Sequence, residues 1–243
     1  MKPTPEQQLE RCVWRHFGQG VTRYGLLQDG DRILIGLSGG KDSLALLELM
    51  ARRAAIHGPK ITVVALHVRM SNVEYESDCT YLQEFAARCG VRLEVRETSF
   101  DSSTDHRKSP CFLCSWNRRK TLFNVAQELG CNKIALGHHQ DDILHTMLLN
   151  LCFQGQFSTM PARLRMRKFD MTIIRPLCMI RESDLVAWAA MKGYQKQKKS
   201  CPYETDSHRW EMREVMQRVE QMSTEARYSM WNALEQAGKL VEE

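Results

Sequence analysis

A glycine- and serine-rich segment, residues 38–43, has the composition of an anion-binding loop. It reads Ser-Gly-Gly-Lys-Asp-Ser and follows the apolar run RILIGLS at residues 32–38. Glycines let the backbone turn sharply and bring its N–H groups close to a ligand. Asp42 and Ser43 favour a helix start, where the N–H groups and the positive end of the helix dipole attract anions. The segment therefore predicts a phosphate-binding loop between a strand and a helix.

Two common phosphate-binding motifs do not match this segment. A Walker A loop would have Ser or Thr after its lysine, but Asp42 follows Lys41 and the spacing back to Gly36 differs. The dinucleotide-binding pattern G-x-G-x-x-G does not occur in the sequence. An ordinary strand-to-helix turn also favours Ser, Gly and Asp. The density of glycine, serine and charge in this hexapeptide favours a functional loop over that simpler interpretation.

A second group with chemical potential is the pair Cys111 and Cys114, the only closely spaced pair among nine cysteines. It precedes a helix that we predict over residues 117–129, and the basic residues around it would lower the pKa of its thiols. A redox pair, a structural zinc site and an iron–sulfur cluster are all open interpretations. Apart from Cys201, we expect the remaining cysteines to be packing or surface residues: Cys12, Cys79, Cys89, Cys131, Cys152 and Cys178.

Histidine and aspartate gather in a third segment, residues 137–142, which reads GHHQDD. It follows the short apolar run KIALG, which we predict to be a strand. A capped helix start would explain a single Asp or His there. Four ionisable side chains within five positions instead favour a site. In such a site Asp141 and Asp142 would hold Mg²⁺ on a nucleotide or orient the reacting groups.

The elements that must position these segments alternate between strands and helices. That alternation predicts crossover connections, and therefore a parallel, Rossmann-like α/β sheet with helices on both faces. Ligands bind such sheets at the carboxyl ends of the strands, where the three segments fall. We predict strands at residues 32–38, 61–68, 93–98, 133–137 and 171–174, and helices at residues 42–53, 81–89, 117–129, 141–153 and 182–191.

Length and composition suit one large soluble domain with small additions. The chain has 243 residues, of which 43% are hydrophobic and 26% charged. We expect a central domain at residues 29–202, with helical N- and C-terminal extensions at residues 1–28 and 203–243. No apolar run approaches the ~20 residues of a membrane helix, and the N-terminus lacks the apolar core of a signal peptide. We therefore expect a cytoplasmic protein with no membrane association.

Positive charge is concentrated in two blocks of the sequence. Residues 161–200 hold ten Lys/Arg against three Asp/Glu, and residues 107–120 hold five basic residues and no acid. The net charge is only +5, so the rest of the chain is acidic on balance. Two basic blocks on such a chain indicate a surface for a polyanion such as a nucleic acid. Solvated helix faces are the alternative interpretation.

The hexapeptide SGGKDS resembles the SGGxDS loop of the PP-loop ATPases, whose fold is described as adenine nucleotide alpha hydrolase-like. These enzymes cleave ATP between its α and β phosphates and adenylate a carbonyl or carboxyl oxygen. The resemblance implies that His67 and Val68, at the end of the second predicted strand, seat the adenine by backbone contacts. It also implies a set of residues that hold the phosphates: Ser38, Gly39, Gly40, Lys41, Asp42 and Ser43.

The order of motifs resembles one branch of that family, the TtcA-type tRNA 2-thiolation proteins. Those proteins carry SGGxDS, CxxC, GHHxDD and then a late cysteine, which is Cys201 here. The branch has a second late CxxC, whereas Cys201 is followed by Pro202 and Tyr203. Three cysteines still suffice for an iron–sulfur cluster with one open iron.

This resemblance implies an ATP-dependent tRNA sulfurtransferase that replaces the C2 oxygen of a pyrimidine, expected to be cytidine, with sulfur. Its implied partners and cofactors are tRNA, ATP, Mg²⁺, a [4Fe-4S] cluster and a sulfur donor, either a cysteine desulfurase or sulfide. A homodimer is a candidate assembly. The implied cluster ligands are Cys111, Cys114 and Cys201. The full set of implied site residues adds the catalytic Asp42, Asp141 and Asp142, and Gly137 at the nucleotide.

Two other functions are compatible with the same loop. A lysidine synthetase activates the same cytidine oxygen but attacks with lysine, so it would have no use for the three cysteines. A nucleotide- and cluster-binding sensor would act through a partner and would release no pyrophosphate with tRNA.

Overall fold

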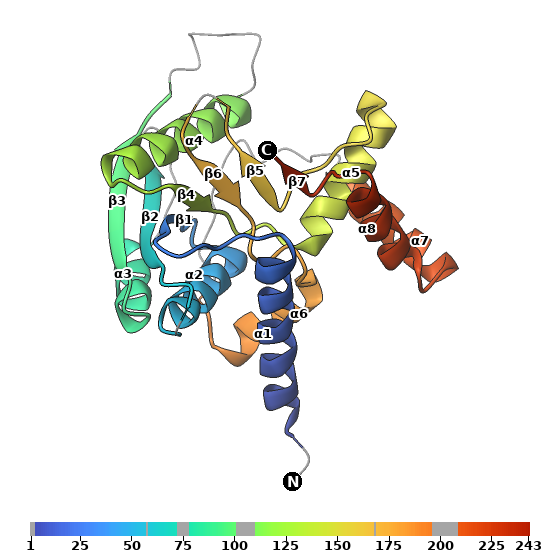
Figure 1. Cartoon of the computed structure of the whole chain (residues 1–243), viewed down its shortest axis with the longest axis horizontal. Coiled ribbons are helices and arrows are strands. Elements are labelled where there is room, and N and C mark those ends of the chain that lie inside the picture. The colour runs from blue at the N-terminus through green and yellow to red at the C-terminus, as the bar shows by residue number, and fades with distance from the viewer. Residues whose placement is uncertain (1–2, 57, 72–77, 101–109, 168, 196–208) are drawn as a thin grey trace.

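The computed structural model describes residues 3–56, 58–71, 78–100, 110–167, 169–195 and 209–243 (Figure 1). The strands are β1 (Arg32–Gly36), β2 (Thr62–Met70), β3 (Arg92–Thr98), β4 (Lys133–Ala135), β5 (Arg163–Arg165), β6 (Thr172–Ile174) and β7 (Val241–Glu242). The helices are α1 (Pro5–Arg23), α2 (Lys41–Ala54), α3 (Cys79–Arg88), α4 (Pro110–Glu128), α5 (Gln140–Gln154), α6 (Glu182–Met191), α7 (Arg209–Met222) and α8 (Ala226–Gln236).

The strands form one mostly parallel sheet, which confirms the predicted α/β class. Their order across the sheet is β3-β2-β1-β4-β6-β5-β7. β1 pairs in parallel with β2 and β4, and β3 and β6 extend the parallel part on either side. β5 runs antiparallel to β6, and β7 runs parallel to β5. These last two strands are too short to show a periodic pattern, so sequence reasoning does not detect them.

Side chains of β1 divide the core into two parts. Ile33 and Ile35 face the cluster that includes residues of α1, α2, α3 and α6. Leu34 faces the opposite side, where it packs with Leu122 and Val125 of α4. Because successive strand residues point to opposite faces of a sheet, one strand supports both helical layers. The predicted arrangement, with helices on both faces, is therefore confirmed.

Helix α4 begins earlier than the sequence pattern indicates. The prediction starts this helix at residue 117, whereas it begins at Pro110. Proline suits the first position of a helix, because the N–H group that it lacks has no partner there. Cys111 and Cys114 therefore lie within the first turns of α4, and not in a loop before it.

The helices at both ends of the chain pack on the central elements. α1 packs against α6, and α7 packs against both α5 and α8. The chain then returns to the sheet at β7, beside β5. A division into a domain at residues 29–202 and two helical extensions stays a prediction.

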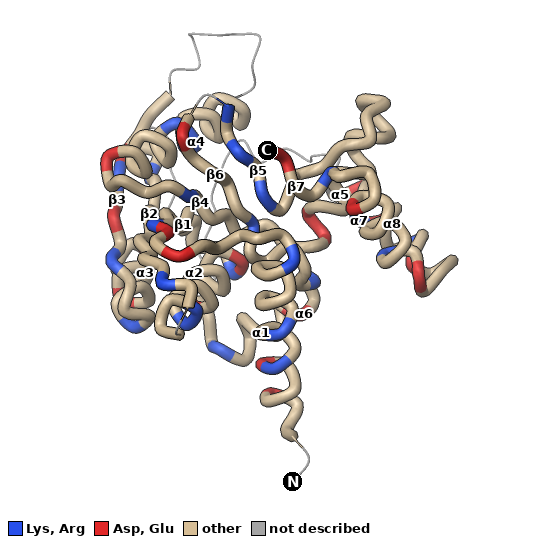
Figure 2. Tube along the Cα trace, viewed as in Figure 1, with Lys and Arg blue, Asp and Glu red and all other residues tan. Residues whose placement is uncertain are grey.

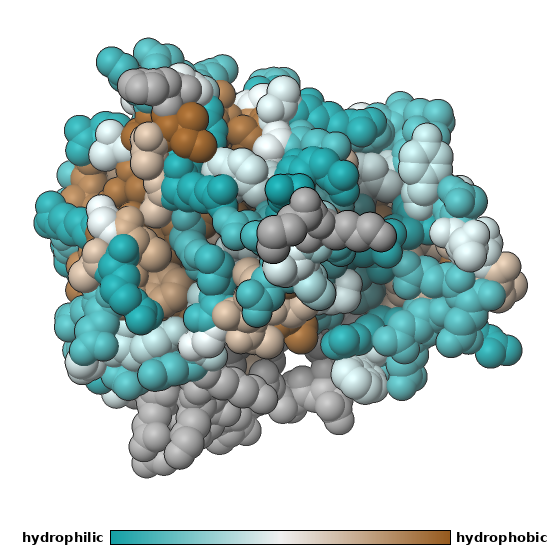
Figure 3. Space-filling model, turned by 90° about the horizontal axis from the view of Figure 1, so that it is seen from below, coloured by the Kyte–Doolittle hydropathy of each residue, from teal (hydrophilic) through white to brown (hydrophobic). Residues whose placement is uncertain are grey.

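Lys and Arg positions and Asp and Glu positions are both spread along the described chain (Figure 2). Seen from below, the molecule is mainly hydrophilic, and hydrophobic residues gather toward the left, the side of β3 and α3 (Figure 3). Among the described helices, none is both long and apolar enough to cross a membrane.

A buried ion pair joins the segment before β1 to β4. Lys133 Nζ donates to Asp31 Oδ2 at 2.7 Å and to the Leu26 carbonyl oxygen at 2.9 Å. Asp31 Oδ1 accepts a hydrogen bond from Asn132 Nδ2 at 2.8 Å. Both charged side chains are buried. Removing one partner would leave the other as an isolated charge in a medium of low dielectric constant.

Replacing Asp31 with Ala should therefore lower the free energy of unfolding by about 3–5 kcal/mol. The matched control is Glu97→Ala, which breaks the exposed pair between Arg69 and Glu97. An exposed pair contributes little, so this control should cost less than about 1 kcal/mol. Urea denaturation of both variants makes the comparison, and equal losses would contradict the assigned role of the buried pair.

Candidate functional site at the carboxyl edge of the sheet

The loop after β1 turns directly into α2, as the glycine- and serine-rich segment predicts. Gly39 has a φ of +84°, in the region that favours glycine. Gly40 is the N-cap of α2 and has no side chain with which to cap the helix. Ser43 Oγ lies 2.9 Å from the Gly40 carbonyl oxygen and 3.2 Å from Ser38 Oγ. No side chain of the N-cap residue binds the first-turn N–H groups of α2, so these groups could bind a phosphate.

The loop after β4 lies directly against this first turn. A Cβ atom on Gly137 would lie 3.1 Å from the carbonyl carbon and oxygen of Asp42 and 3.2 Å from the backbone nitrogen of Ser43. These neighbours are backbone atoms in a close-packed turn, so they cannot yield as the end of a flexible side chain would. Glycine at 137 therefore lets two loops of the carboxyl edge meet.

Replacing Gly137 with Ala should push the two loops apart and weaken ATP binding by about 10- to 100-fold. The strain of such an overpacked contact is about 1–3 kcal/mol, which corresponds to that change if it falls on the bound state. The control is Gly18→Ala in α1, because a Cβ there meets nothing within 4 Å. Calorimetric titration with ATP measures both variants. Wild-type affinity in Gly137→Ala would show that the close approach does not shape the nucleotide site.

A cavity of about 170 Å³ opens between the phosphate loop and α4. His67 is buried in its wall, with its Nδ1 atom 2.7 Å from the Leu37 carbonyl oxygen. Burial, reinforced by the charges of Arg118 and Arg69, lowers the pKa of His67 despite that hydrogen bond. The ring is therefore neutral near pH 7. The lining residues are Gly36, Leu37, Ser38, Leu66, His67, Val68, Arg118, Arg119, Leu122 and Leu136.

Lys41 ties the phosphate loop to the start of α6. Its Nζ atom lies 3.1 Å from Asp42 Oδ2 and 3.3 Å from Glu182 Oε1. Burial alone would lower the pKa of Lys41, but the two carboxylates outweigh it and raise the pKa above its usual value. The other carboxylate oxygen of Asp42, Oδ1, is buried without a hydrogen-bond partner. A buried anionic oxygen of this kind suits a metal ion that accompanies a phosphate.

The two aspartates of the GHHQDD segment have different surroundings. Asp142 closes a capping box at the start of α5, where its Oδ2 accepts from the His139 N–H at 3.1 Å. Asp141 is buried, and its Oδ2 accepts from the Glu182 N–H at 2.7 Å. The preceding His138 accepts from Arg175 Nε at 3.3 Å. Asp141 therefore holds α5 and α6 together, while Asp142 lies at the helix start beside the phosphate loop.

Sequence reasoning does not identify one arginine of the site, Arg227, which lies near the end of the chain. Arg227 of α8 donates from Nη2 to Asp141 Oδ1 at 2.7 Å and from Nη1 to Gln140 Oε1 at 3.1 Å. Burial would raise the pKa of Asp141, but Arg227 and the Glu182 N–H hold it below its usual value. Nothing in the sequence around Arg227 signals this contact, because its partner lies 86 positions away.

The two cysteines of the CxxC segment lie on the first turns of α4, with Cys111 exposed and Cys114 half-buried. Both precede Arg118 and Arg119, which reach the cavity beside Ser38. Cys201 falls outside the described residues. The expected convergence of three cysteines therefore stays a prediction.

The basic blocks occupy several elements. Arg118, Arg119 and Lys120 lie on α4, while Arg163 and Arg165 lie on β5. The two β5 arginines pair with carboxylates, Arg163 with Glu243 and Arg165 with Asp170. Arg107, Lys108, Lys168, Lys196, Lys198 and Lys199 fall outside the described residues.

Comparisons with known proteins agree with this architecture. A family model described as a PP-loop domain matches residues 9–219. The tRNA-cytidine(32) 2-sulfurtransferase of Sorangium cellulosum is 40% identical over 194 residues, which cover 77% of this chain and 67% of that protein. The protein of the same name from Aeromonas salmonicida is 36% identical over 190 residues, covering 76% and 62%. The chain thus matches about two thirds or less of these relatives' length.

One solved structure is similar over nearly the whole chain. It is the U34-tRNA thiolase NcsA from Methanococcus maripaludis with its [4Fe-4S] cluster. The TM-score is 0.79 at 25% identity, and the match covers 94% of this chain and 79% of that one.

Proposed function

The chain belongs to the PP-loop domain family, and from that premise we propose that it is an ATP-dependent tRNA 2-sulfurtransferase acting on cytidine. The names of the relatives from Sorangium and Aeromonas support cytidine, at tRNA position 32, as the substrate. The similarity to a tRNA thiolase that carries a [4Fe-4S] cluster supports the same class of reaction.

The placement of the CxxC pair on α4 carries this proposal. Cys111, Cys114, Arg118 and Leu122 are spaced so that they share one face of the helix. Arg118 and Leu122 line the cavity that also contains Ser38 of the phosphate loop. Cys114 lies one turn before Arg118, about 6 Å along the helix axis. The CxxC pair and the proposed nucleotide-binding loop therefore lie near each other at one edge of the sheet.

The chemistry requires both groups. The C2 carbonyl of cytidine is a poor electrophile, and its oxygen is a poor leaving group. Attack of that oxygen on the α phosphorus of ATP would release pyrophosphate and form an adenylate. Sulfide would then add at C2, and the C2–O bond would break to release AMP. We propose that the first-turn N–H groups of α2, with Lys41, stabilise the negative charge on the departing pyrophosphate.

The side chains near the phosphate loop and at the start of α4 suit two cofactors, Mg²⁺ and a [4Fe-4S] cluster. We propose that Mg²⁺ binds Asp42, whose Oδ1 is a buried oxygen without a partner, with Asp142 close by at the start of α5. A [4Fe-4S] cluster would be held by Cys111, Cys114 and Cys201, because soft thiolates are its usual ligands. When bound, it would supply an iron without a protein ligand, which suits a sulfide nucleophile.

Exposed residues of α4 would contact the tRNA backbone. Arg119 and Lys120 are exposed, and Lys120 Nζ lies 5.3 Å from the centre of the Trp116 ring. Trp116 is itself 47% exposed. Basic and aromatic side chains together suit RNA, because the cations bind phosphates while the ring stacks on an unpaired base. The target cytidine must leave its stack to reach the cavity.

Asp42→Ala and Ser43→Ala should each slow tRNA-dependent pyrophosphate release by on the order of 100-fold or more, as loss of a preorganised charge-stabilising group does. The readouts are pyrophosphate and the 2-thiocytidine content of digested tRNA by mass spectrometry. Asp29→Ala is the control. Asp29 is exposed and precedes β1, so it lies at the other end of this strand from the phosphate loop. Unchanged pyrophosphate release in both variants would overturn the assignment of Asp42 and Ser43 to the ATP site. Formation of 2-thiouridine would show that the substrate is uridine and not cytidine.

After anaerobic cluster reconstitution, Cys114→Ser should lack thiolation activity and keep its ATP binding, since Cys114 lies outside the phosphate loop. The iron content of this variant should be well below the value for a full [4Fe-4S] cluster, which is about four atoms per chain. The matched control is Cys152→Ser, which removes an exposed thiol from α5. Full activity in Cys114→Ser, with lysine incorporated into tRNA, would favour the lysidine synthetase alternative.

A further inference from the structure

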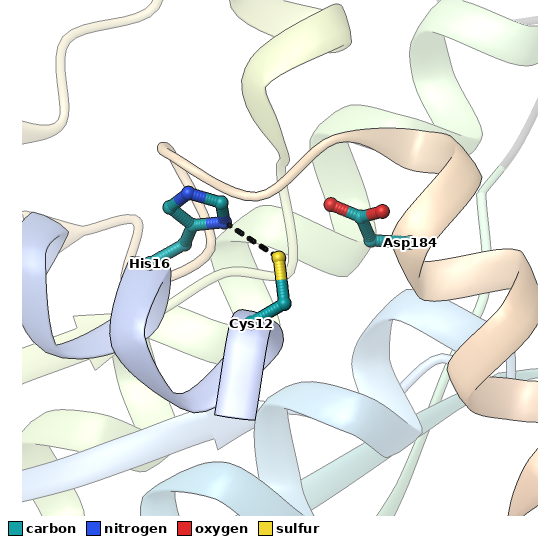
Figure 4. Close-up of side chains that lie close together, drawn as sticks. All are labelled: Cys12, His16 and Asp184. Carbon is teal, nitrogen blue, oxygen red and sulfur yellow. Dashed lines mark hydrogen bonds between the residues drawn. The ribbon is translucent and has the colours of Figure 1, made fainter. Parts of the chain in front are cut away.

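Three potential metal ligands meet away from the phosphate loop. Cys12 and His16 lie four residues apart on α1, and Asp184 lies in the first turn of α6. Cys12 Sγ and His16 Nδ1 are 3.5 Å apart. One ligand atom from each of the three residues lies within 4.8 Å of the other two (Figure 4). Two separate helices thus present a thiol, an imidazole and a carboxylate to one point.

The spacing of the Cys12 and His16 ligand atoms matches a tetrahedral zinc site. With Zn–S and Zn–N bonds of about 2.3 and 2.0 Å, two tetrahedral ligands lie about 3.5 Å apart. The Cys12–His16 separation has this value without rearrangement. Asp184 offers a carboxylate oxygen within 4.8 Å of both atoms, and its side chain would move closer to complete a third bond. A thiolate and a carboxylate together would also balance the charge of a divalent ion.

The same three residues lie in a different setting from the CxxC pair. Cys12, His16 and Asp184 are all half-buried. Cys12, His16 and Asp184 line a cavity of about 520 Å³ between α1, the start of α6 and α8. The cavity wall also includes Gln140 and Arg227, the residues that contact each other beside Asp141. An ion held by three ligands at this wall would keep a fourth position open to the cavity.

We propose that Cys12, His16 and Asp184 bind a zinc ion whose fourth position faces the cavity. The ion would join α1 to the first turn of α6. Its ligand Asp184 lies two residues after Glu182, which pairs with Lys41 of the phosphate loop. It is distinct from the proposed cluster site, because Cys111 and Cys114 lie on α4, across the sheet from α1. The zinc site does not depend on the proposed thiolation activity.

Cobalt(II) is the probe for this site, because thiolate-bound cobalt absorbs in the near ultraviolet and tetrahedral cobalt absorbs in the visible. The starting protein is the full chain with Cys111, Cys114 and Cys201 replaced by Ser, so that the cluster cysteines cannot bind the probe. This chain should bind one equivalent of cobalt with both absorption features, and zinc should displace it. Addition of imidazole should change the visible bands, because the fourth position is open.

Cys12→Ser in the same background should abolish the near-ultraviolet band. His16→Gln and Asp184→Asn should weaken zinc binding by at least about 10-fold, since even loss of residues that only orient metal ligands costs 10- to 100-fold. Cys152→Ser is the matched control and should bind cobalt normally. Far-ultraviolet circular dichroism should be alike in all variants, which separates loss of the site from loss of the fold.

Zinc at about 100 times its dissociation constant should also raise the melting temperature of the starting chain by about 5–10 °C. The same addition should leave Cys12→Ser unchanged. The proposal is overturned if the starting chain binds no stoichiometric cobalt, or if Cys12→Ser keeps the thiolate band. In either case the Cys12–His16 contact is only a hydrogen bond within α1.

Discussion

The backbone of Gly137 lies so close to the first turn of α2 that an added side-chain carbon would be 3.1 Å from the carbonyl group of Asp42. This contact brings the loop after β4 onto the loop after β1, so that the start of α5 adjoins the start of α2. Both helices then direct N-terminal groups toward the same edge of the sheet, where parallel strands place their ligands. The meeting of these two loops is therefore a consequence of strand adjacency, since β1 and β4 are neighbours, and of one residue without a side chain.

A chain of charged contacts connects this edge to the end of the molecule. Lys41 pairs with Glu182, whose N–H group binds Asp141, and Asp141 in turn pairs with Arg227 of α8. The links are half-buried or buried, so they are screened less than surface pairs. Helix α8 is thus anchored to the starts of α5 and α6 at this edge of the sheet. We infer that α8 helps to hold the geometry of the site, although it contributes no residue to the phosphate loop.

Sequence patterns predict the parallel sheet and the turn from β1 into α2 well, because both depend on local features. The apolar run before Ser38 and the glycines after it specify a strand, a turn and a helix within a few residues. The sequence pattern does not predict the start of α4, because Pro110 and the CxxC pair lack the apolar periodicity that marks the rest of that helix. It does not predict the contacts of Glu182 and Arg227 either, since they depend on how distant helices dock. The sequence predicts Cys12 to be a packing or surface residue, whereas its proximity to Asp184 comes only from the packing of α1 on α6.

In the proposed reaction, ATP chemistry and sulfur chemistry meet at C2 of the target cytidine, and an isotope experiment tests this directly. A tRNA whose target cytidine carries oxygen-18 at C2 is thiolated in the presence of ATP, and the AMP is analysed by mass spectrometry. If the C2 oxygen is adenylated and then displaced by sulfide, each 2-thiocytidine formed should be matched by one AMP that carries the heavy oxygen. Formation of 2-thiocytidine together with unlabelled AMP would contradict the account, because the C2 oxygen would then leave without passing through an adenylate.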